Sequence, residues 1–309
     1  MNTQTKESPR LFSNADLRKL ILPLVLEQTL VITVGMVDTM MVSSVGEAAV
    51  SGVSLVDMLV NLVLSVFAAL STGGAVVTSQ FLGAKREKDA CHSSRQLIYT
   101  VAIFSSIVMM VCMLACRPIL SFFFGSIEAD VMDNARIYLL ICAVSFPFMG
   151  VYDAAAALFR AMGNSLIVLQ ASCIMNAVNI VGNAIGIYVL KMGVVGVAVP
   201  TLLSRIVAAA ILFILLKQPR HVIHMTKEKF RFDGKIIRRI LCIGIPSGIE
   251  NGIFQLGRVA VVSIISGFGT VQIAANGVAN SLDSMGCIMG QAMSLAMITV
   301  IGQCVGAAS

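Results

Sequence analysis

Four polar side chains that can hold a cation or a proton lie at similar depths in three apolar segments. Asp38 interrupts the apolar stretch VGMVDTMMVSSVG. Asn179 and Asn183 lie one helical turn apart in a second segment, and Thr201 lies in a third. At 1.5 Å per residue, each lies about 10 to 16 Å from the predicted outer end of its segment. Their oxygens suit a hard cation such as Na⁺, and a desolvated carboxyl group exchanges protons near neutral pH, so we predict a Na⁺ or proton site at these four residues.

Further polar residues follow helical faces in other apolar segments. In segment 48–80, Asp57 and Asn61 share a face with Ser54 and Ser65. These stripes predict a water-filled cleft, although polar packing between helices remains an alternative, as it does for the asparagines. The secondary cavity candidates are Asp57, Asn61, Asn176, Glu27, Glu250, Asn280 and Asp283.

Two of these acids, Glu27 and Glu250, each lie four residues after a proline. A proline inside a helix removes a backbone donor and can bend the helix. The predicted hinges are Pro23 and Pro246. Two deep arginines, Arg205 and Arg258, require anionic partners, which the two glutamates could supply.

The composition indicates a membrane protein. Hydrophobic residues make up 57% of the 309 and charged residues 12%, and the mean hydropathy is +0.91. A bilayer-spanning helix requires about 20 apolar residues. We therefore predict an all-α membrane protein whose eight spans are 17–43, 48–80, 96–116, 134–158, 165–190, 193–216, 236–265 and 271–305.

The basic residues predict the orientation. With a cytoplasmic N-terminus, seventeen of the 22 Lys and Arg residues fall in cytoplasmic segments. The outer segments contain only Arg117, Arg136 and Lys191. Because Lys and Arg in short loops stay on the cytoplasmic side, we expect a multi-pass protein of the inner or plasma membrane. The net charge of +6 then reflects topology, and no nucleic-acid partner is expected.

An internal repeat indicates two lobes. A shift of 223 residues aligns LPLVLEQ with IPSGIEN and QFLGA with QCVGA. Six spans separate the copies, so both copies cross the membrane in the same direction, as in transporters with parallel repeats. We predict a six-helix N-terminal lobe over 1–222 and the first two helices of a C-terminal lobe over 223–309, and we expect the chain to be a fragment of a twelve-helix protein.

In these motifs the sequence resembles the multidrug and toxic compound extrusion (MATE) family, of the multidrug/oligosaccharidyl-lipid/polysaccharide flippase superfamily. The resemblance rests on the early proline followed by VDTMMVSSVGEAAVSGVSL, on QFLGAKRE, on LFRAMGNS and on GQCVGA. It implies export of cationic amphipathic compounds in exchange for Na⁺ or H⁺, by a monomer without a cofactor. It also implies a polar pocket at Asp38, Asn179, Asn183 and Thr201, with bending at Pro23.

One position departs from the family pattern. Asn183 stands where the family has an acid, so the coupling ion stays open, and Asp57 could supply the missing charge. A lipid-linked oligosaccharide flippase is the alternative within transport, and a non-functional truncated product is another. Tyr152 and Asp153 resemble half of an intramembrane aspartyl protease signature, but GxGD and HExxH are absent, so we expect no enzyme.

Overall fold

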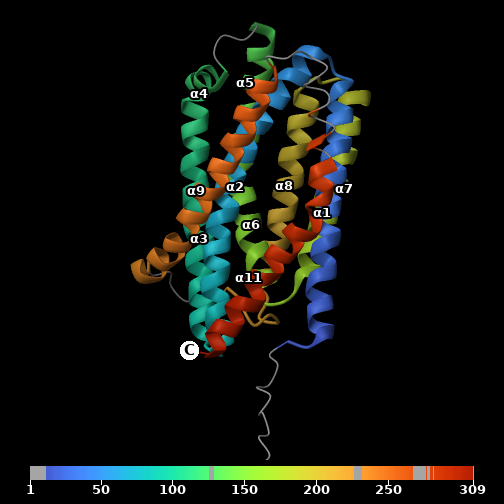
Figure 1. The fold of residues 1–309 in the computed structure, drawn as a ribbon. Helices are drawn as coiled ribbons and strands as arrows, with labels where there is room; N and C mark the ends of the chain where they lie inside the picture. The colour runs from blue at the N-terminus through green and yellow to red at the C-terminus, as the bar shows by residue number, and fades with distance from the viewer. Residues whose placement is uncertain are drawn as a thin grey trace, which may run out of the picture.

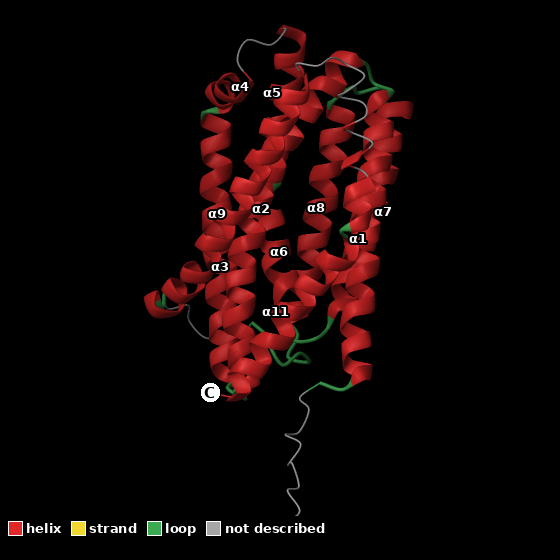
Figure 2. Ribbon diagram, viewed as in Figure 1, coloured by secondary structure: helices red, strands yellow, loops and turns green. Residues whose placement is uncertain are grey.

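The computed structural model describes residues 12–124, 129–225, 232–266, 276, 279, 280 and 282–308. Among these residues the chain forms helices and loops, without strands (Figure 2). The helices are α1 (Asn14–Ser43), α2 (Glu47–Gly83), α3 (Glu87–Leu114), α4 (Cys116–Phe124), α5 (Ala129–Val144), α6 (Phe146–Ala161), α7 (Ser165–Ala184), the π-helical turn η1 (Ile185–Val189), α8 (Val195–Leu216), α9 (Gly234–Ser266) and α11 (Ile288–Ala308).

The all-α membrane class predicted from the sequence is confirmed. Six of the described helices are long and apolar enough to cross a bilayer, and the bent pair of α5 and α6 makes a seventh candidate. The longer α9, predicted as a span over 236–265, is not among these candidates. The last predicted span, 271–305, lies partly outside the described residues, and its described part turns at Cys287 before α11 begins.

The span predicted over 134–158 is two helices in the structure. The axes of α5 and α6 differ by 48°, with Ser145 between them. Pro147 lies in the first turn of α6, where its missing N–H is tolerated, and its ring prevents α5 from continuing. By contrast, the predicted hinges Pro23 and Pro246 lie inside continuous helices.

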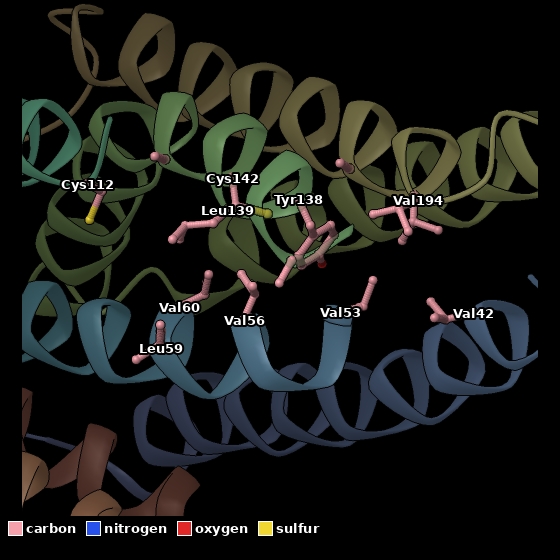
Figure 3. Packing of buried hydrophobic residues seen from close by; sticks show 14 of the residues in the cluster. Val42, Val53, Val56, Leu59, Val60, Cys112, Tyr138, Leu139, Cys142 and Val194 are labelled. Carbon is pink, nitrogen blue, oxygen red and sulfur yellow. The ribbon is translucent and has the colours of Figure 1, made fainter. Parts of the chain in front are cut away.

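One apolar core joins α2 to α5 near the predicted outer half of the bundle. Val53, Val56 and Val60 of α2 point toward Tyr138 and Leu139 of α5 (Figure 3). Farther along α2, Phe67 is fully buried and meets the rings of Phe104 and Phe146 edge to face. This core fixes the position of α2, which carries Asp57, relative to the break between α5 and α6.

The two copies of the repeat contact each other at the ends of α2 and α11, which lie near the marked C-terminus (Figure 1). A Cβ atom on Gly83 would lie 2.0 Å from the carbonyl oxygen of Gln303. A Cβ atom on Gly306 would lie 1.9 Å from the carbonyl oxygen of Gln80. The shift of 223 residues relates Gly83 to Gly306 and Gln80 to Gln303, so each glycine packs on the glutamine of the other copy. A reciprocal contact of this kind is what a two-fold axis produces.

Candidate functional site

Close packing of α7 and α8 brings the polar residues of these helices together. A Cβ atom on Gly186 would lie 2.3 Å from the carbonyl oxygen of Gly196, so only glycine allows this approach. One turn earlier, Gly182 packs on the ring of Pro200. The adjacent Thr201 therefore faces α7, and its hydroxyl lies 3.1 Å from the Asn179 amide nitrogen.

The helix containing Asp38 packs against the same face of α7. The Asn183 amide nitrogen donates to Asp38 Oδ1 at 3.0 Å and to Asn179 Oδ1 at 3.2 Å. Asn183 is fully buried, and its Oδ1 has no hydrogen-bond partner among the described residues. A buried acceptor without a partner beside a carboxylate is the arrangement that a proton or a small cation would complete. The π-helical turn η1 begins two residues after Asn183, and such turns are frequent at functional sites.

The Asn179 amide can be placed in two orientations. In one, its nitrogen donates to Thr201 Oγ1 at 3.1 Å, and its oxygen accepts from Asn183. In the other, the nitrogen lies 3.0 Å from Asp38 Oδ1, and the oxygen accepts from Thr201. The second orientation satisfies an ionised Asp38, whereas the first places an amide oxygen against the carboxyl group. An ionised Asp38 therefore favours the second orientation.

A cavity of about 280 Å³ opens beside this cluster. Of the predicted pocket residues and secondary candidates, those that line this cavity are Asp38, Asp57, Asn61, Asn176, Asn179 and Thr201. Asn183 lies behind Asn179, in contact with Asp38. The structure thus brings together the four predicted pocket residues and three of the secondary candidates.

The remaining secondary candidates lie elsewhere. Glu250 is exposed on α9, and Asp283 is exposed near Cys287. Asn280 lines a separate cavity of about 310 Å³ with Asn61 and Arg258. Glu27 is buried and does not line the 280 Å³ cavity; it forms an ion pair with Arg160 instead.

The suggestion that Glu27 is a partner of Arg205 or Arg258 is therefore wrong. Arg160, predicted to lie in a cytoplasmic connection, is in the last turn of α6, where it reaches Glu27. Arg205 donates to the hydroxyl of Ser145 at 2.7 Å and lines the 280 Å³ cavity. Its guanidinium acts electrostatically on Asp57, which also accepts a 3.1 Å hydrogen bond from the Tyr138 hydroxyl.

Sequence reasoning missed Tyr138 and Ser145. Tyr138 could have been found by the depth argument, because it is a polar residue within a predicted span. Ser145 could not, because its role depends on the break that Pro147 imposes between α5 and α6.

Known proteins resemble this chain over most of its length. The "Uncharacterized transporter YisQ" of Bacillus subtilis is 24% identical over 288 residues, and the match covers 92% of this chain and 63% of YisQ. The "Probable multidrug resistance protein NorM" of Thermotoga maritima is 26% identical, and the match covers 93% of this chain and 62% of NorM. This chain thus spans less than two thirds of the length of these relatives.

Solved structures share the fold. A structure described as "Crystal structure of MATE in the bent conformation" matches with a TM-score of 0.86 at 20% identity, over 94% of this chain and 65% of that one. A multidrug resistance MATE transporter in an outward-facing conformation matches with a TM-score of 0.85 over the same shares. The family model described as MatE matches residues 23–185, more than half of the chain. The chain therefore belongs to the MATE family and is a multi-pass membrane protein.

Proposed function

We propose that the protein is a secondary antiporter that exports cationic amphipathic compounds in exchange for Na⁺ or H⁺ by alternating access. The observation that carries the proposal is the contact between Asp38 and the two asparagines of α7 at the wall of a 280 Å³ cavity. A carboxylate at this position requires neutralisation, and the surrounding amide and hydroxyl oxygens suit a monovalent cation. The names of the NorM relatives and of the outward-facing transporter support the export of drugs.

The coupling step follows from the two states of Asp38. When Asp38 is ionised, the Asn179 nitrogen turns toward it and holds α1 against α7. When a proton or Na⁺ neutralises Asp38 from outside, the amide turns over and donates to Thr201, and the contact between the helices weakens. Moving one charge across 100 mV is worth about 2.3 kcal/mol, enough to bias two conformations more than tenfold.

Bending of α1 at Pro23 would then change the shape of the cavity. Asp38 lies fifteen residues beyond Pro23 on the same helix, so the residues between them must move when the helix bends. With the N-terminus in the cytoplasm, as the basic residues predict, Asp38 loads from the outer side.

A flippase for lipid-linked oligosaccharides is less well supported. Binding a pyrophosphate requires several cations at one place. Among the described residues that line the 280 Å³ cavity, Arg205 is the only arginine, and it lies beside Asp57.

The experiment is efflux of a fluorescent cationic dye from proteoliposomes, with Na⁺ and pH gradients imposed separately. Asp38→Asn should abolish gradient-driven efflux while protein yield is unchanged. Asp133→Asn, which removes an exposed acid from α5, is the matched control and should transport normally. Full transport by Asp38→Asn would refute the role of Asp38, and the gradient that drives efflux identifies the coupling ion.

A further inference from the structure

A second buried acid site lies away from the Asp38 pocket. Glu27 Oε1 and Arg160 Nη2 are 2.5 Å apart, and both side chains are largely buried. Glu27 Oε2 and Arg160 Nε have no hydrogen-bond partner among the described residues. Glu27 is eleven residues before Asp38, or about 16 Å along α1, so the two acids belong to different sites.

Asp153 lines a small cavity together with Arg160, the basic member of this ion pair. The cavity measures about 70 Å³, and it lies between α2, α6 and α11. Its polar lining residues are Ser71, Thr72, Asp153, Arg160 and Thr299. Asp153 precedes Arg160 by two turns on α6, so both side chains lie on one face. This space is large enough for one or two water molecules, which could carry a proton to the acid.

The charges around Asp153 do not balance. The charged groups that act on it are Arg160 and Arg205, which are positive, and Glu27, which is negative. The described residues of α2 and α11 that line the cavity contribute hydroxyl and apolar groups. Arg160 is paired with Glu27, and Arg205 also acts on Asp57, so neither guanidinium is reserved for Asp153, which forms no ion pair with any described residue.

Asp153 therefore needs a positive charge of its own, because a carboxylate without an ion-pair partner is costly inside a membrane. The guanidinium of Arg160 lines the cavity and would repel Na⁺ there. A proton on Asp153 satisfies the balance without this repulsion.

We propose that Asp153 is a second proton-binding site, separate from the Asp38 pocket, which stays protonated because Glu27 occupies Arg160. The site also lies at the contact between the two copies of the repeat. Thr299 donates to the carbonyl of Arg160 at 3.0 Å, and Gln303 donates to that of Ala161 at 2.7 Å. Separation of α11 from α6 would open the cavity to water and let Asp153 exchange its proton on this side.

Infrared difference spectroscopy of the purified protein tests this site directly, because a protonated carboxyl group has its own carbonyl band. Wild-type protein at neutral pH should show a band that Asp153→Asn removes and that the exposed control Asp133→Asn leaves in place. Glu27→Gln should remove the same band, because Arg160 then pairs with Asp153 and ionises it. Asp38→Asn should leave the band unchanged, and no transport is required for any of these readings.

Three outcomes would overturn the proposal. The first is a spectrum that Asp153→Asn does not change. The second is loss of the band on addition of Na⁺ at constant pH, which would indicate a Na⁺ site. The third is failure of Asp153→Asn to fold, because asparagine closely resembles the protonated acid and should be tolerated if Asp153 is neutral.

Discussion

Adding one methyl group at the reciprocal contact between α2 and α11 should separate these helices. A Cβ atom on Gly306 would lie 1.9 Å from the Gln80 carbonyl oxygen, and a Cβ atom on Gly83 would lie 2.0 Å from that of Gln303. Both obstacles are backbone atoms of a helix, which cannot turn away as a flexible side chain could. Gly306→Ala therefore requires the two helices to move apart.

The size of the effect follows from the strain that opening relieves. Replacing glycine by alanine inside a helix stabilises the helix by roughly 0.5 to 1 kcal/mol, but this gain is the same whether α2 and α11 lie together or apart, so it does not change the opening. Overpacking a close contact costs roughly 1 to 3 kcal/mol. A strain of about 2 kcal/mol corresponds to an increase of about 30-fold in the fraction of molecules with this contact open.

A buried cysteine can report the opening. Ser79 of α2 is fully buried, and a Cβ atom on Gly302 of α11 would lie 2.6 Å from its Cβ atom. Ser79→Cys should react with a thiol reagent only when α2 and α11 separate. The background replaces the native cysteines that are exposed, which are Cys173, Cys242, Cys287 and Cys304, by serine. In this background Gly306→Ala should raise the labelling rate about 30-fold.

Gly252→Ala is the matched control, because a Cβ atom on this glycine of α9 meets no atom within 4 Å. Equal labelling rates in Gly306→Ala and Gly252→Ala would refute the reasoning. Gly83→Ala should have an effect of similar size to Gly306→Ala, because the contact is reciprocal. A difference of more than tenfold between these two variants would count against the two-fold relation.

Three further predictions test other parts of the molecule. Asp57→Asn should lower gradient-driven dye efflux by about tenfold, since it removes the charged acceptor of the Tyr138 hydroxyl; unchanged efflux would show that Asp57 does not supply the missing charge. Phe67→Ala should cost about 3 to 5 kcal/mol in unfolding free energy, measured in detergent, whereas Phe122→Ala should cost little because Phe122 is 84% exposed. Burial pushes the pKa of Asp233 upward, but hydrogen bonds from the Lys235 and Ile236 amides and from His92 outweigh this and hold the pKa below its usual value. Asp233 therefore stabilises the start of α9 above the ordinary carboxyl pKa of about 4, and this contribution is lost as pH falls through the lowered value. Amide hydrogen exchange at Lys235 should lose protection in that range, and Asp233→Ala should lack protection at every pH.

Depth in the membrane predicted the Asp38 cluster because helix geometry is regular. A residue count converts directly into height, so polar groups at one height on neighbouring helices can meet. The structure places Asp38 within 3.0 Å of Asn183 in this way. A residue count along a helix does not give the rotation of that helix about its axis. It could therefore not show that Asn176 and Asn179 line the cavity while Asn183 lies behind Asn179.

Contacts at the helix ends could not be predicted by the same method. The Glu27–Arg160 pair joins residues 133 positions apart. The predicted span ends at residue 158 and therefore leaves Arg160 in a loop. The helix in fact continues to Ala161, and the Arg160 side chain reaches Glu27 of α1. Basic residues at span ends thus have two interpretations, and only packing distinguishes a cytoplasmic loop from a buried ion pair.

The repeat explains the contact between the copies but not the polar site. The shift of 223 residues aligns a glycine and a glutamine at the end of α2 with the same two residue types at the end of α11. The glycine of each helix packs on the glutamine of the other. The same shift places Val261 of α9 at the position that corresponds to Asp38, so α9 has no carboxylate at that position. In the proposed mechanism, a rocking motion about the two-fold contact would involve both copies equally, whereas neutralisation of Asp38 would change only the contact of α1 with α7 within the first copy. The charge on one helix can therefore bias a motion that the symmetric contact alone would leave balanced.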